Sequence, residues 1–170
     1  MKAKLADICN FKSQLYVAAG LTPRLRTDNI HNMKTLILCT GNSCRSQMAA
    51  AFLKSFDPAG EIFSAGTKPE AEVNPNSIIV MSELGIDIKA CMPKSVDIYI
   101  NEEFDYVVTV CDHAKETCPV FLGEVKNRLH MGFDDPAAAR GTEEEILKQY
   151  RLIRDQIEKR FRAFWEGLQK

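Results

Sequence analysis

Short apolar runs alternate with longer stretches of helical spacing from residue 34 to the end of the sequence. The apolar runs predict strands at 34–39, 61–65, 105–111 and 127–132. The run at 105–111 is rich in β-branched and apolar residues, as expected of a strand that is buried on both faces. Because strands that alternate with helices form parallel sheets, we predict an α/β fold, a three-layer sandwich with a central four-stranded parallel sheet.

Two helices are predicted between the strands. The first follows residue 44, and the second begins at Asn74, has a proline at its first position and ends at Gly85. Each helix has apolar residues on one side that are expected to be buried. In the first helix these are Met48, Phe52 and Phe56, and in the second they are Ile78, Ile79, Met81 and Leu84.

A third helix is predicted at the end of the sequence. Thr142 and Glu145 have the spacing of a capping box, which marks a helix start. An apolar stripe follows over about six turns. Its members are Ile146, Tyr150, Ile153, Ile157, Phe161, Phe164 and Leu168. The opposite side is charged and is expected to face solvent.

The composition of the 170 residues restricts the class of partner. With 22 basic and 23 acidic residues the net charge is −1, which offers no basic field for nucleic acid and no polybasic membrane patch. The apolar runs are far shorter than a membrane span. Six cysteines without a secretion signal favour reduced thiols and a cytoplasmic location.

Residues 1–32 differ from the rest of the sequence. They contain a short amphipathic helical pattern followed by a polar linker, and Met33 would itself make a natural start. We therefore divide the chain into an N-terminal extension at 1–32 and a domain at 33–170. Two alternatives stay open: the start is placed too early, or the extension docks a helix on the core or on a partner.

The segment from Cys39 to Ser46 is the strongest chemical signal. Cys39 ends an apolar run and Arg45 follows six positions later, so the segment predicts a strand, a tight loop and a helix. Backbone N–H groups of such a loop bind a tetrahedral oxyanion, and the helix dipole, Arg45 and Ser46 are expected to favour the thiolate of Cys39, the predicted nucleophile. The predicted oxyanion-binding residues are Thr40, Gly41, Asn42, Ser43, Cys44, Arg45 and Ser46.

A second cysteine pair, Cys111 and Cys118, begins at the end of the third predicted strand. In a straight helix their α-carbons would be about 10 Å apart, whereas a disulfide needs about 4.4–6.8 Å. Joining them would therefore require the segment to unwind or bulge.

Asp135, in an Asp-Asp-Pro loop after the fourth strand, is a candidate general acid. Partial burial would raise the pKa of its carboxyl.

The chain resembles the thioredoxin-coupled arsenate reductases in three motifs. In order along the sequence these are CTGNSCRSQMA, VVTVCDHAKETCPVF and GFDDPA. That family shares its fold with the low-molecular-weight tyrosine phosphatases, whose phosphate-binding loop has the same Cys-x5-Arg-Ser pattern. The similarity covers about Met33 to Leu168. It implies that arsenate, with phosphate or sulfate as analogues, binds the loop and that no cofactor takes part.

The resemblance also implies a relay of three cysteines. Cys39 attacks arsenic while Asp135 protonates the departing oxygen, and Cys111 then attacks Cys39 and releases arsenite. Cys118 attacks Cys111, and thioredoxin reduces the resulting Cys111–Cys118 disulfide. Some related reductases hold potassium through an acidic residue, but the matching position is Ala50, so that site is not carried over.

Alternative functions stay open at this point. The first is a phosphatase for phosphotyrosine or small phosphoesters that uses Cys39, Arg45 and Asp135; against it, Ala137 stands where similar phosphatases have an aromatic residue. The second is a redox or oxyanion sensor. Two details of the relay also remain open. The reductant could be of the glutaredoxin type in place of thioredoxin, and Cys91 could be another resolving thiol.

A zinc site is disfavoured, because the histidines are scattered and there are no Cys-x2-Cys pairs.

Overall fold

The computed structural model describes residues 33–111 and 121–170. The expectations for residues 1–32 and for Cys118 lie outside these ranges. The strands are β1 (Lys34–Cys39), β2 (Glu61–Gly66), β3 (Phe104–Thr109) and β4 (Val125–His130). The helices are α1 (Arg45–Phe56), α2 (Pro75–Ser82) and α4 (Glu143–Leu168), with 3-10 turns η2 (Val96–Tyr99) and η3 (Pro136–Ala138).

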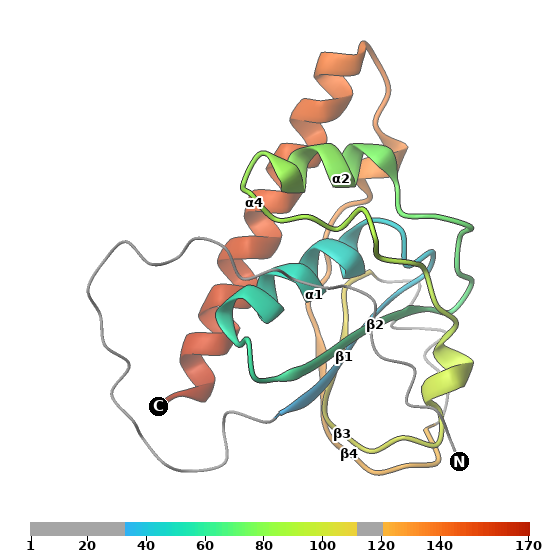
Figure 1. Ribbon diagram of the computed structural model, residues 1–170, viewed down its shortest axis with the longest axis vertical. Coiled ribbons are helices and arrows are strands. Elements are labelled where there is room, and N and C mark those ends of the chain that lie inside the picture. The colour runs from blue at the N-terminus through green and yellow to red at the C-terminus, as the bar shows by residue number, and fades with distance from the viewer. Residues whose placement is uncertain (1–32, 112–120) are drawn as a thin grey trace.

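The four strands form one parallel sheet in the order β2-β1-β3-β4, which confirms the predicted architecture (Figure 1). β1 lies in the middle, and its Leu38 pairs with Ala65 of β2 and Thr109 of β3. Beyond the last ladder pair, Val110 donates its N–H to the carbonyl of Leu38 over 2.8 Å. The chain therefore leaves β1 and β3 at the same edge of the sheet, which brings Cys39 and Cys111 to neighbouring positions.

Side chains of the central strands alternate between two apolar clusters, as the period of a strand requires. Ile37 and Val108 belong to the larger cluster, which includes the buried residues of α1 and α4. Leu36 and Val107 point to the other face, where η2 and the chain around Phe121 cover them. Figure 1 shows α1 and α4 on the same side of the sheet, where they pack against each other.

Two predicted strand ranges are shifted in the structure. β3 covers residues 104–109 rather than 105–111, because its ladder to β4 ends at Thr109. β4 covers 125–130 rather than 127–132 and is half-exposed along much of its length, since it lies at the edge of the sheet. An edge strand is only partly covered by neighbours, so its sequence carries a weaker apolar signal.

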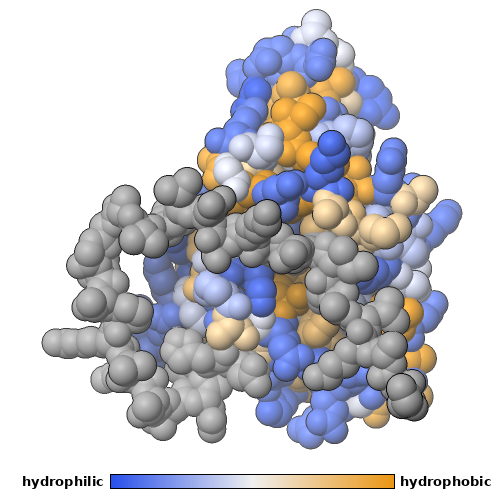
Figure 2. Space-filling view, in the orientation of Figure 1, coloured by the Kyte–Doolittle hydropathy of each residue, from blue (hydrophilic) through white to orange (hydrophobic). Residues whose placement is uncertain are grey.

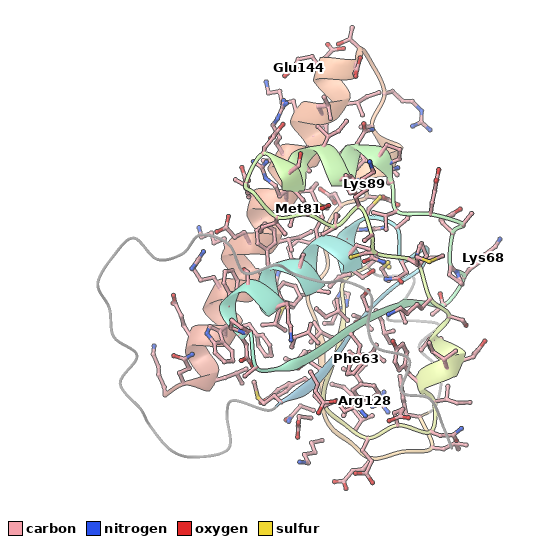
Figure 3. All side chains as sticks on the ribbon, viewed as in Figure 1. Phe63, Lys68, Met81, Lys89, Arg128 and Glu144 are labelled. Carbon is pink, nitrogen blue, oxygen red and sulfur yellow. The ribbon has the colours of Figure 1, made fainter. Side chains whose placement is uncertain are left out.

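α2 packs through one side only. Asn74 caps it, as predicted, by accepting the N–H of Asn76. Val80 and Met81 are buried, and Met81 lies on the side of α2 that faces the body of the molecule (Figure 3). The expected burial of Ile79 and Leu84 is wrong, since they are 40% and 42% exposed. Figure 2 shows apolar surface near α2, next to hydrophilic residues.

α4 begins with the predicted capping box: the N–H of Thr142 donates to the carboxylate of Glu145, and the N–H of Glu145 donates to the hydroxyl of Thr142. The stripe is centred slightly differently from the prediction. Its buried members are Leu147, Tyr150, Ile153, Arg154, Ile157, Phe161 and Trp165. Arg154 is accommodated because its guanidinium donates to the Val80 carbonyl and to the Glu83 carboxylate. Neither α4 nor any other helix of the described ranges has a stretch suited to crossing a bilayer.

We predict that Ile157→Ala lowers the free energy of unfolding by about 2–5 kcal/mol, because loss of this fully buried side chain leaves a cavity in the larger apolar cluster. Urea denaturation followed by circular dichroism measures the change. Leu152→Ala is the matched control on the same helix, since Leu152 is 50% exposed. Equal losses for the two variants would contradict the packing described above.

Candidate active site

The loop between β1 and α1 is held in shape by Asn42. Asn42 has a φ of +50°, the left-handed region that asparagine tolerates better than most residues, and it is fully buried. Its side-chain oxygen accepts the N–H of Lys94 over 2.8 Å, and its carbonyl accepts a hydrogen bond from Gln47 over 3.0 Å. Gln47 also donates to the carbonyl of Met92, so the segment 92–94 braces the loop from behind.

The sulfur of Cys39 lies inside this loop and receives hydrogen bonds from it. The N–H of Asn42 donates to Cys39 Sγ over 3.0 Å, and the hydroxyl of Ser46 lies 2.9 Å from the same atom. Because Ser46 Oγ accepts a hydrogen bond from Asn42 Nδ2, its own proton can point to the sulfur. A chain of hydrogen bonds therefore runs from Asn42 through Ser46 to the sulfur of Cys39.

Burial works against ionisation of Cys39. The residue is only 3% exposed, and this burial raises the pKa of its thiol above the ordinary value. The hydrogen bonds from Ser46 and Asn42 lower the pKa but do not outweigh burial, and the neighbouring Cys111 raises it further. The loop donors therefore favour the thiolate as predicted, but burial outweighs them and the pKa of Cys39 is raised, because the sequence pattern shows the donors but not the depth of the sulfur.

Arg45 joins the loop to the segment after β4. Its guanidinium donates to the carbonyl of Phe133 over 3.1 Å and to the carboxylate of Asp135 over 2.8 Å. Its Nε is buried and has no acceptor among the described residues. Asp135 also accepts the N–H of Ala137, which fixes the turn η3. The Asp135 side chain is 47% exposed and therefore about half-buried.

Cys111 lies beside the loop. Its sulfur is 3.4 Å from the hydroxyl of Thr40, and the residue is 4% exposed. Cys39, Cys44 and Cys111 are free thiols. Cys91, expected as a reduced thiol, is disulfide-bonded.

These residues line an open cavity of about 600 Å³. The lining residues from the predicted loop are Cys39, Thr40, Gly41, Ser43, Cys44 and Arg45, and those from the other predicted site positions are Cys111 and Asp135. Asn42 and Ser46 lie behind the cavity rather than in it, since both are fully buried. The described residues contain no group of three or more histidines, cysteines and carboxylates placed to hold a metal ion.

Several contributors to the site are not among the predicted site residues. Glu70 reaches the cavity from the segment after β2, and Phe133 and Asp134 reach it from the segment after β4. Tyr150 of α4 packs under the loop with its hydroxyl 3.8 Å from Cys44 Sγ, and burial raises the pKa of this phenol. Helical spacing identified Tyr150 as a core residue but could not show that the core reaches the loop.

The chain is similar to known proteins along most of its length. Residues 34–170 match the model of the family described as low molecular weight phosphotyrosine protein phosphatase. An arsenate reductase from Halalkalibacterium halodurans is 45% identical over 130 residues, which are 76% of this chain and 92% of the relative.

Solved structures agree with this family. A structure titled as an arsenate reductase in the phosphate binding state has a TM-score of 0.64 and 26% identity over 80% of this chain and 98% of the other. A thioredoxin-dependent arsenate reductase from Corynebacterium glutamicum has a TM-score of 0.60 and 27% identity over 81% of this chain and 61% of the other.

We predict that Ser46→Ala raises the pKa of Cys39 further, because it removes a hydrogen bond that stabilises the thiolate. The pH profile of iodoacetamide labelling, read at Cys39 by mass spectrometry, should move to higher pH. Ser55→Ala is the control, since its hydroxyl bonds the Phe52 carbonyl at the far end of α1. An unchanged profile in Ser46→Ala would show that burial alone sets the pKa.

Proposed function

The chain belongs to the low-molecular-weight phosphotyrosine protein phosphatase family, and within that family we propose that it reduces arsenate to arsenite in arsenic detoxification. One observation carries the proposal: a second thiol, Cys111, opens into the same cavity as Cys39 and contacts the loop through Thr40. Hydrolysis of a phosphoester needs one nucleophilic cysteine, whereas reduction needs a second thiol within reach of the first.

Arsenate enters as a near-isostere of phosphate and is held by the loop amides and by Arg45. The buried Nε of Arg45, which has no acceptor among the described residues, supports this role because an oxyanion oxygen would satisfy it. Cys39 attacks arsenic as the thiolate, and one arsenate oxygen leaves as water after it takes up protons. Asp135 is the proposed proton donor, and its position in the cavity supports this assignment.

The redox step transfers two electrons to arsenic. Cys111, as the thiolate, attacks Sγ of Cys39, a Cys39–Cys111 disulfide forms, and the electron pair of the breaking S–As bond stays on arsenic. Arsenic(V) thereby becomes arsenic(III) and leaves as arsenite, while two thiols are oxidised to one disulfide. Support for this step comes from the neighbouring ends of β1 and β3, which place both cysteines in one cavity.

The last step moves the oxidation away from the loop. Cys118 attacks Cys111, Cys39 leaves as a thiol, and thioredoxin reduces the Cys111–Cys118 disulfide by exchange. Cys118 lies outside the described residues, so its part rests on the resemblance of the segment around Cys111 to the thioredoxin-coupled arsenate reductases. The thioredoxin-dependent relative from Corynebacterium glutamicum favours thioredoxin over a glutaredoxin-type reductant. A reducing compartment such as the cytoplasm suits this chemistry.

The phosphatase alternative uses Cys39, Arg45 and Asp135 and leaves the second thiol pair idle. It is not favoured, because the relatives of moderate identity are named arsenate reductases. Ala137 also lines the cavity at the position where an aromatic residue would stack on phosphotyrosine.

We predict steady arsenate-dependent NADPH consumption by the wild type in the presence of thioredoxin and thioredoxin reductase. Cys118→Ser should stop after about one equivalent of arsenite, because the Cys39–Cys111 disulfide cannot be resolved. Ser55→Ala, a substitution at the far end of α1 and outside the relay, is the control and should keep turning over. The relay would be wrong if the wild type consumed no NADPH while all three proteins hydrolysed an aryl phosphate.

A further inference from the structure

Glu70 lies at the mouth of the oxyanion cavity in a fixed position. Its N–H donates to the carbonyl of Gly41 over 2.8 Å, so its backbone is tied to the loop. Its side chain lies over the same residue, since a Cβ added to Gly41 would come within 3.0 Å of Glu70 Cγ. The carboxylate lines the cavity together with Arg45 and Cys39.

The mouth of the cavity has an excess of negative charge. Glu70, Asp134 and Asp135 are the carboxylates among its lining residues, and Arg45, the cation there, is already paired with Asp135. Glu70 makes no ion pair among the described residues. Lys68, two residues away in the chain, is not a lining residue and extends outward into solvent (Figure 3). Lys68 therefore does not neutralise the charge of Glu70 at the cavity mouth.

We propose that Glu70 is a specificity-determining residue that favours oxyanions carrying an acidic hydroxyl over fully deprotonated dianions. A carboxylate accepts a hydrogen bond from a hydroxyl but repels an oxygen that has no proton to donate. Buried or partly buried sites discriminate strongly when a polar group finds no partner on the wrong ligand. The inference rests on the proposed function for its substrate, arsenate, which still carries hydroxyl groups at neutral pH.

Sulfate is the natural test of this selectivity. It has the same tetrahedral shape as phosphate and arsenate, but it carries two charges and no hydroxyl at neutral pH. Phosphate carries one or two hydroxyl groups in the same range and serves as the unreactive analogue of arsenate. Because Glu70 is exposed, screening limits its effect to about three- to fivefold, and this effect shrinks as salt is added.

The experiment measures how well each anion protects Cys39 from iodoacetamide, read at Cys39 by mass spectrometry, at neutral pH and low ionic strength. The full-length wild type is compared with Glu70→Gln, which keeps the length of the side chain and removes its charge. Glu72→Gln is the matched control, since Glu72 is an exposed carboxylate that does not line the cavity. The readout is the ratio of the sulfate and phosphate concentrations that give half protection.

We expect Glu70→Gln to lower this ratio about three- to fivefold, by strengthening sulfate relative to phosphate, and Glu72→Gln to leave it unchanged. An unchanged ratio in Glu70→Gln overturns the inference, as does an equal weakening of both anions, which would assign Glu70 to the loop framework. The assay needs no arsenate turnover. A shifted ratio in a protein that fails to reduce arsenate would therefore support the selectivity while refuting the proposed function.

Discussion

The hydrogen bonds that run from Asn42 through Ser46 to the sulfur of Cys39 are the constraint on which the site depends. They require Asn42 to adopt a left-handed backbone and to be fully buried. Its remaining polar atoms must then find partners, because an unpaired buried amide is costly. Gln47 and the backbone of Lys94 provide them. The segment 92–94, distant in sequence, thereby holds the loop between β1 and α1 in place, and the shape of the loop depends on the fold around it.

Among its described lining residues, the cavity has one cation, Arg45, to balance the negative charges in it. Burial holds the Cys39 thiol toward its neutral form, and the single guanidinium of Arg45 is shared with Asp135. Adding both a thiolate and a dianion to this site would place several negative charges around one cation, which a partly desolvated cavity opposes. Three parts of the site therefore act in the same direction: the buried thiol, the Arg45–Asp135 pair and the carboxylate of Glu70 all limit how much negative charge can enter.

Local patterns predicted the elements and the nucleophilic loop, because strands, caps and the Cys-x5-Arg spacing are written in consecutive residues. They failed where three-dimensional surroundings decide the outcome. Ile79 fits the apolar pattern of α2 but faces solvent, since that helix packs through one side. The depth of Cys39 reversed the expected direction of its pKa. Glu70 had no signal at all, because only the pairing of β1 with β2 and the return of the chain bring it to the loop.

The lack of space at Gly66 separates the parts of the site that cannot change from those that can. A Cβ at this position would come within 2.4 Å of the Thr40 carbonyl oxygen, so even alanine would push the loop out of place. Asn42 is similarly confined by its backbone and its partners. The rim, in contrast, consists of exposed side chains such as Glu70 and Ala137, which can be exchanged without moving the loop. A lineage built on this framework can therefore acquire a new substrate preference through rim substitutions alone, while the catalytic geometry is inherited unaltered.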